Sequence, residues 1–235
     1  MHYLRRLLSK LGLLSLIRNS YIWKIKNKNL TTTFSNNAKH IFQEVISLYE
    51  SEGIEIWPEF GTLLGIIRDK NFIKHDLDLD FGIFGNKVTS EKIRDIMLGH
   101  GFIPTVKCLR LNENKHQVIS TKFVKNKVDV DIYFFYEHSN QIDKLVLYGL
   151  ETDNGLSVEE EFAYYGKLST YENLFSKFNL GSMNIFDTVI SIPSNIHQHL
   201  IELYGPDYVI PDPNWHSSKR INRQKDKAPS ILSYE

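Results

Sequence analysis

Cysteine is nearly absent from this 235-residue sequence, which contains only Cys108. A single thiol excludes an internal disulfide framework and a zinc site built from several cysteines. Long apolar runs are also missing, because Gly12 and Ser15 interrupt the hydrophobic N-terminal stretch well short of the roughly 20 residues that span a bilayer. No small-residue cleavage site follows that stretch, which argues against a secretory signal peptide. We therefore expect a cytoplasmic protein, either free or peripherally bound to the inner face of a membrane.

Acidic residues are missing from the first 43 positions, which hold eight of the 28 Lys and Arg residues. The rest of the chain carries 20 basic against 28 acidic residues. This balance argues against a nucleic-acid partner, because general binding to nucleic acid requires a basic face. Two interpretations of the basic N-terminal segment, residues 1–34, remain open. It forms either an amphipathic helix on an anionic membrane surface or a helix packed on the protein's own core.

Hydrophobic periodicity predicts one α+β domain over residues 35–210, with a mixed β-sheet flanked by helices. The first helix should begin at Ser35 or Asn36, either of which can cap it, and should stop at Gly53. Further helices are expected within GTLLGIIR and at residues 89–100 and 195–205. Alternation of apolar and polar residues predicts strands at 54–57, 77–84, 102–111, 117–124, 128–136, 141–149 and 188–193.

The last segment, residues 211–235, is polar and rich in proline, so we expect it to wrap the surface as a loop. The predicted organisation is thus a basic segment, 1–34, a catalytic domain, 35–210, and a polar tail, 211–235. Trp215 and His216 in the tail have two interpretations. Their rings either line a site for an acceptor sugar or anchor the tail to the body of the protein.

Paired carboxylates are the most informative chemical feature. Asp78 and Asp80 alternate along an otherwise apolar strand, so both side chains project from one face. Two such charges repel each other unless a metal ion or a proton neutralises them. Asp129 and Asp131 share a face of a later strand, and one of them should complete the site. Oxygen ligands of this kind suit Mg²⁺ or Mn²⁺, which also bind phosphate oxygens.

Gly61 and Thr62 stand between a predicted strand and a predicted helix. Glycine permits close approach of the backbone to a phosphate, and the N-terminus of a helix favours an anion. Together with the carboxylates, these residues predict a site that holds a nucleotide diphosphate on a divalent metal. Asp131 is then the candidate for the general base that accepts the proton of an attacking hydroxyl.

The stretch GTLLGIIRDKNFIKHDLDLDFGI resembles the signature of the LicD and fukutin family, in which GTLLGxxR is followed by FIPWDDDID. Two later segments are similar as well: Asp131-Ile132-Tyr133 to the family's Asp-Ile-Phe, and LIELYGPDY to its Leu-x-x-Leu-Tyr-Gly-Asp. The family-like Asp-Ile-Tyr favours Asp131 over Asp129. The residues that match the first signature are Gly61, Thr62, Gly65, Arg68, Phe72, Ile73, Asp76, Asp78 and Asp80.

Three positions depart from that signature: Lys74 replaces Pro, His75 replaces Trp, and Leu77 replaces the middle Asp of the acidic triplet. The last change keeps the pair of alternate aspartates, so metal binding should survive it. Asp76 either binds substrate or caps a turn. Arg68 either offsets charge that develops on phosphate or makes a surface ion pair.

What the resemblance implies is a nucleotidyltransferase-like fold and a phosphotransferase activity. Such an enzyme moves a phospho-alcohol (phosphocholine, phosphoribitol or phosphoglycerol) from a CDP-linked donor to a sugar hydroxyl of a cell-surface or lipid-linked glycan, releasing CMP. Three alternatives stay open. The first is a true nucleotidyltransferase that releases pyrophosphate, and the second is a non-catalytic nucleotide-binding module. The third is a structural module in which the acidic residues are buried ion pairs.

Overall fold

The computed structural model describes residues 21–112, 116–152, 157–212, 215 and 219–235. Its helices are α3 (Tyr21–Ser51), α4 (Phe60–Asp69), α5 (Ser90–Gly99), α6 (Val158–Tyr165) and α7 (Ile196–Tyr204). The strands of its main sheet are β1 (Ile56–Pro58), β2 (Asp78–Phe84), β3 (Ile103–Arg110), β4 (Gln117–Lys125), β5 (Val128–Glu137), β6 (Lys144–Glu151), β7 (Ser169–Ser176), β10 (Arg223–Lys225) and β11 (Ser230–Tyr234). A separate hairpin pairs β8 (Leu180–Ile185) with β9 (Thr188–Pro193).

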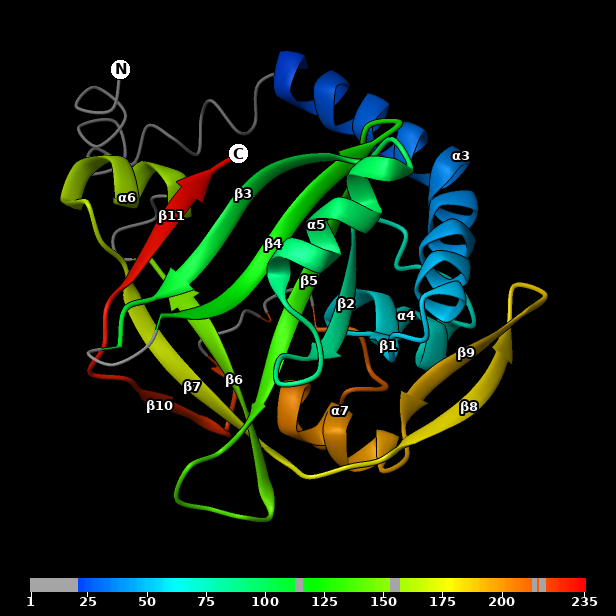
Figure 1. The fold of residues 1–235 in the computed structure, drawn as a ribbon. Coiled ribbons are helices and arrows are strands. Elements are labelled where there is room, and N and C mark those ends of the chain that lie inside the picture. Colours follow the sequence, from blue (N-terminus) through cyan, green and yellow to red (C-terminus); the bar gives the residue numbers. More distant parts are fainter. Residues whose placement is uncertain (1–20, 113–115, 153–156, 213–214, 216–218) are drawn as a thin grey trace.

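Strand β5 is the branch point of the curved main sheet (Figure 1). The strand order is β10-β7-β6-β5-β4-β3-β11, and β2 leaves this path by pairing with β5, while β1 pairs with β2. The β2–β5 pairing is parallel and the others in the sheet are antiparallel. The predicted α+β class and mixed sheet are therefore confirmed, and each predicted strand is present with bounds shifted by a few residues.

Helix α3 covers the apolar face of β2 and β5 (Figure 1). Ile41, Phe42 and Val45 recur at helical spacing, and all three are fully buried against the side chains that β2 and β5 present to the core. The predicted cap at Ser35 or Asn36 is wrong, because the helix already runs from Tyr21 through both positions. The predicted stop is confirmed: the helix ends at Ser51, and Gly53 adopts a φ of +64°.

The C-terminal tail does not form the surface loop that its polarity predicts. Strand β10 pairs with β7, and β11 pairs with β3 at the edge of the sheet. Asp226, between the two strands, accepts hydrogen bonds from the guanidinium of Arg110, with Nη2 at 3.0 Å from Oδ1. The tail thus closes both ends of the main sheet, which its composition could not indicate because the pairing partners lie far away in the chain.

The first 20 residues lie outside the described part of the chain, so the membrane-facing helix stays a prediction there. Within the described residues, no helix is both long enough and apolar enough to cross a membrane. The predicted division at residues 34 and 210 also stays a prediction, although α3 continues across the first of these positions without a break.

The indole ring of Trp57, on β1, packs closely against the neighbouring strand β2. The indole is fully buried, lies opposite Gly82 in the β1–β2 register, and packs against Phe84 and Phe135. A Cβ added at Gly82 would lie 2.5 Å from the indole Nε1, closer than packed atoms can approach. Glycine is required here because the ring occupies the space of a side chain.

We therefore expect Gly82→Ala to lower the free energy of unfolding by about 1–3 kcal/mol through overpacking, measured by urea denaturation. Gly99→Ala is the matched control: an added Cβ there meets no atom within 4 Å, and alanine favours the helix by up to about 1 kcal/mol. Equal stability of wild type and Gly82→Ala would contradict the close contact between the indole and β2.

Candidate functional site

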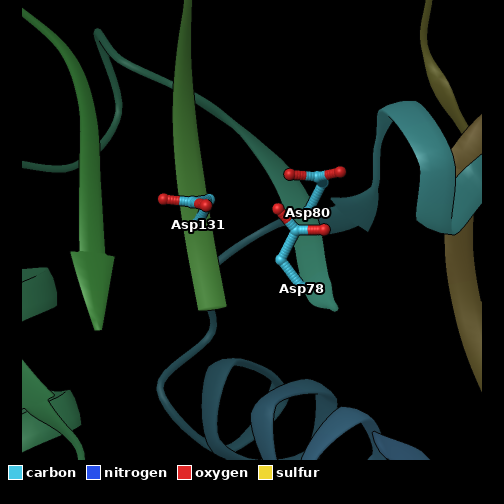
Figure 2. Close-up of side chains that lie close together, drawn as sticks. All are labelled: Asp78, Asp80 and Asp131. Carbon is cyan, nitrogen blue, oxygen red and sulfur yellow. The ribbon is translucent and has the colours of Figure 1, made fainter. Parts of the chain in front are cut away.

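Parallel pairing of β2 with β5 gathers three aspartates. The register sets Asp78 opposite Asp129 and Asp80 opposite Asp131. Figure 2 shows the carboxyl groups of Asp78, Asp80 and Asp131 close together on these two strands. One carboxylate oxygen from each residue lies within 4.8 Å of the others. Asp129, the alternative third residue, stays outside this group, and its side chain is 47% exposed.

The β1–α4 turn holds Asp80 by both of its backbone polar groups. The hydroxyl of Thr62 accepts a hydrogen bond from the Asp80 N–H at 2.9 Å, and the Glu59 N–H donates to the Asp80 carbonyl at 2.9 Å. Phe60 lies between them with a φ of +44°, a left-handed conformation that is costly for a bulky residue. The tight turn thus fixes Asp80 from the adjacent element, at the expense of local backbone strain.

The side chain of Glu59 is buried completely beneath this turn. The Trp57 indole N–H donates to Oε2 at 2.7 Å, and His199 Nε2 lies 2.8 Å from Oε1. His199 is fully buried on α7, 140 residues away in the sequence. A buried carboxylate is costly unless it is hydrogen-bonded, so this arrangement ties α7 to the turn that holds Asp80. Nothing in the spacing of the sequence indicated this contact.

Burial and mutual repulsion make the three carboxyl groups hard to ionise. Burial raises the pKa of Asp80 well above its ordinary range, and the charges of Asp78 and Asp131 raise it further. Burial raises the pKa of Asp131 to about 7, with Lys122 opposing the shift and Asp78 adding to it. The pKa of Asp78 is also raised, chiefly by burial. A cation between them would relieve both effects, because it favours the charged forms.

Lys122 is one cation that the structure supplies. It lies opposite Asp131 in the β4–β5 register, and its Nζ is 3.3 Å from Asp131 Oδ2 and 3.5 Å from Asp129 Oδ2. Burial alone would lower the pKa of Lys122, but the two carboxylates outweigh it and raise the pKa above its usual value. Sequence reasoning missed Lys122. In the sequence, Lys122 is a charged residue within the alternating strand QVISTKFV. Only the β4–β5 register places it beside Asp131.

The other predicted residues lie beside the triad. An added Cβ at Gly61 would lie 2.7 Å from Asp76 Oδ2, so the absence of a side chain admits the Asp76 carboxylate. Burial raises the pKa of Asp76 to about 6, and the charge of Asp78 adds to the shift. Thr62 is buried and engaged with Asp80. The phosphate contacts expected of Gly61 and Thr62 stay predictions, as does a substrate contact of Asp76.

Arg68 makes the ion pair that was one of its two interpretations. Its Nε and Nη2 donate to the two carboxylate oxygens of Asp69, each at 2.8 Å. Arg68 is not among the described residues that line the cavity around the triad. Its phosphate contact stays a prediction, and in this structure its donors are directed at a neighbouring side chain.

A cavity of about 380 Å³ opens in front of the triad, within the size range of small-molecule sites. Its lining includes Asp78, Asp80, Asp131 and Lys122, together with Phe60, Tyr133, Tyr148 and Arg220. Trp215 stacks near Tyr204 of α7, with ring centroids 4.6 Å apart, so it contacts the body of the protein. His216 lies outside the described residues.

The triad fits a divalent metal ion by the chemistry of its donors. Three carboxylate oxygens converge on one point from two rigid strands, and hard cations such as Mg²⁺ and Mn²⁺ prefer such ligands. A metal held there by three carboxylates would keep further coordination positions for water or phosphate oxygens. The arrangement is therefore suited to binding a phosphorylated ligand in the cavity.

Curated relatives share the part of the chain that builds this site. The proteins named "Ribitol-5-phosphate transferase FKTN" from Macaca fascicularis and Homo sapiens are 27% and 26% identical to this chain over 187 residues. Each alignment covers 77% of this chain but 35% of the relative. The chain thus spans about a third of the length of the curated relatives it matches.

One solved structure with partial similarity is that of the lincosamide antibiotic adenylyltransferase LnuA with lincomycin bound. It is 9% identical, the comparison covers 67% of this chain and 79% of that one, and the TM-score is 0.38. Similarity at this level carries no argument about fold or function.

The family comparison covers the site itself. The model described as "LicD/FKTN/FKRP, nucleotidyltransferase domain" matches residues 53–174, more than half of the chain. The matched range contains β1, the β1–α4 turn and both strands that carry the three aspartates. The chain therefore belongs to the LicD/FKTN/FKRP family of nucleotidyltransferase domains.

Proposed function

We propose that this protein transfers a phospho-alcohol from a CDP-linked donor to a sugar hydroxyl of a cell-surface glycan, with Mg²⁺ or Mn²⁺ as cofactor. The observation that carries the proposal is the convergence of Asp78, Asp80 and Asp131 at one cavity. Among the three cargoes that the sequence leaves open, ribitol 5-phosphate is the first to test, because the curated relatives are named ribitol-5-phosphate transferases.

The proposed reaction is a displacement at the phosphorus that carries the alcohol. An oxygen–phosphorus bond forms from the acceptor hydroxyl, the bond between the two phosphates of the donor breaks, and CMP leaves with the electron pair. A bound divalent metal would neutralise phosphate charge. The proton of the acceptor hydroxyl needs a base, and we assign this role to Asp131. Its carboxylate lies at the cavity, where it can accept that proton.

Two residues of the chain prepare the triad for this chemistry. Thr62 fixes the backbone of Asp80, so the metal ligands need little rearrangement when the donor binds. Lys122 neutralises part of the charge near Asp131, which lowers the cost of keeping three carboxylates together. A true nucleotidyltransferase would use the same groups but attack the phosphate nearer the nucleoside and release pyrophosphate. The released product distinguishes the two reactions.

Asp80→Asn should abolish the stabilisation that Mg²⁺ and a nucleotide together give to the wild type. Binding to the native state stabilises it by about 2.7 kcal/mol at a hundredfold excess of ligand over Kd. The measurement is the melting temperature with CTP, CDP-ribitol, CDP-choline, CDP-glycerol, UDP-glucose or ATP, each with and without Mg²⁺. Without metal, Asp80→Asn should melt no lower than the wild type, because it removes a carboxyl group whose ionisation burial and the neighbouring charges oppose.

Asp129→Asn is the matched control, since Asp129 also lies beside Lys122 but is outside the triad. It should keep the metal-dependent shift. A shift with one CDP-alcohol, confirmed by CMP release in the presence of a glycan acceptor, would support the proposed transfer and identify the cargo. A shift only with triphosphates, with pyrophosphate as product, would favour the nucleotidyltransferase. If no nucleotide gave a metal-dependent shift, the proposal would be wrong.

The stability of the metal-free protein should fall as pH rises from about 4 to 7. The pKa of Asp131 is about 7 in the folded protein and near 3.8 in the unfolded chain, so the folded state binds protons more tightly in this window. Protonation of Asp131 therefore stabilises the fold at low pH, by about 1–3 kcal/mol, and this contribution is lost as pH rises through 7. Mg²⁺ should restore stability most strongly at pH 8.

Urea denaturation at pH 5, 6, 7 and 8, with EDTA or with Mg²⁺, measures this dependence. Asp131→Asn should flatten the metal-free pH dependence, whereas Asp129→Asn should retain it. If the metal-free stabilities of the wild type and of Asp131→Asn rose by the same amount between pH 5 and pH 8, the assignment of a raised pKa to this carboxyl group would be refuted.

A further inference from the structure

Arg220 brings a guanidinium group to the cavity that the aspartates line. It lies in the C-terminal tail and lines the same cavity as Asp78, Asp80 and Asp131. Its Nε is buried and has no hydrogen-bond partner. Within the described part of the chain, its side chain makes no ion pair with a carboxylate. A buried N–H donor normally has an acceptor, and the Nε of Arg220 lacks one.

Aromatic rings hold the flat faces of the guanidinium. Its central carbon lies 4.5 Å from the ring centroid of Phe60 and 5.8 Å from that of Trp215. Phe60 is itself fixed edge-to-face on Tyr133, and Trp215 packs on Tyr204. Such cation–π contacts offset part of the desolvation of the charge. They use the faces of the group, however, and leave the N–H edges available to a ligand.

Three other basic side chains near the sheet are already engaged. Arg68 binds Asp69, Arg110 binds Asp226, and Lys122 binds Asp131. Burial lowers the pKa of Arg220, which records the cost of keeping its charge away from water, but arginine remains protonated. An anionic ligand in the cavity would provide the missing acceptors. An arginine fork matches the oxygens of phosphate in particular.

We propose that Arg220 binds a phosphate of the donor's diphosphate in the cavity that the three aspartates line. The proposal rests on the proposed function, because the diphosphate of a CDP-linked donor is the ligand concerned. The diphosphate would then be held between the metal side of the cavity, formed by β2 and β5, and the guanidinium supplied by the tail. Arg220 lies beyond residues 53–174, the range that the family model matches, so its role comes from the geometry of this chain.

Arg220→Gln should weaken the binding of CDP, measured by calorimetry with Mg²⁺, by about 10- to 100-fold, the range expected for lost hydrogen bonds to a charged group. Its affinity for Mg²⁺ alone should stay the same or increase, because the cavity loses a positive charge. Arg220→Lys should recover part of the CDP affinity, since it keeps the charge without the fork. In the transfer assay, the KM for the CDP-alcohol should rise in Arg220→Gln.

Lys219→Gln is the matched control, because it removes the same charge from the next residue, which is exposed and paired with Asp212. It should bind CDP as the wild type does. CDP affinity in Arg220→Gln equal to that of the wild type would overturn the role of Arg220 and leave the proposed function intact. A parallel loss of melting temperature and of the response to Mg²⁺ alone would also overturn it, because it would indicate that Arg220 only anchors the tail. A wild type that binds neither CDP nor CDP-alcohols with metal would overturn both proposals.

Discussion

Repulsion among three closely spaced carboxylates is the constraint from which the rest of the site follows. Parallel pairing of β2 with β5 sets Asp80 beside Asp131, and Asp78 joins them from the same face of β2. Like charges in such a place can persist only if a cation, a proton or hydrogen bonds compensate them. This requirement accounts for the raised pKa values of Asp80 and Asp131. It also accounts for the ion pair between Lys122 and Asp131 and for the fit of the triad to a divalent metal.

The rest of the fold keeps these strands from moving apart. The opposite faces of β2 and β5 are apolar and packed beneath α3, so hydrophobic burial holds the strands while the acidic face remains open to the cavity. On the acidic side, Thr62 and the backbone of Glu59 bind Asp80, and the buried contact between Glu59 and His199 fixes the turn to α7. The carboxylates are therefore held by elements that are distant in the sequence.

Patterns within a single element were readable from the sequence. Alternation predicted β2 and β5 and placed the aspartates on one face of each, because side chains repeat every two residues along a strand. That Asp131 and not Asp129 completes the triad followed from the similarity to the family's Asp-Ile-Phe, and in the structure the carboxyl group of Asp131 lies close to those of Asp78 and Asp80. Helix α6 and strand β7 were not predicted, since their mixed polar and aromatic residues show neither period clearly.

Contacts between distant elements could not be read in the same way. Lys122 reaches Asp131 only because of the β4–β5 register, and Glu59 meets His199 only because α7 packs under the β1–α4 turn. The tail shows the same limit: its polar, proline-rich composition favours a loop, but β10 and β11 are hydrogen-bonded to the edges of β7 and β3. Pairing with an existing edge needs little hydrophobic pattern, because backbone groups supply the bonds.

Two parts of the chain line the cavity: the range that the family model matches and the C-terminal tail. The range matched by the family model supplies the acidic side of the cavity, where charge must be compensated by a cation. Arg220, anchored on Phe60 and Trp215, comes from the tail and supplies a cation that needs an anion. A metal-bound diphosphate is the kind of ligand that would satisfy both groups, since its metal would neutralise the aspartates and its free oxygens would offer acceptors to the guanidinium. Strands β10 and β11, which follow Arg220 in the sequence, tie the tail into the sheet. This pairing keeps the guanidinium at the cavity and makes the C-terminal segment part of the site.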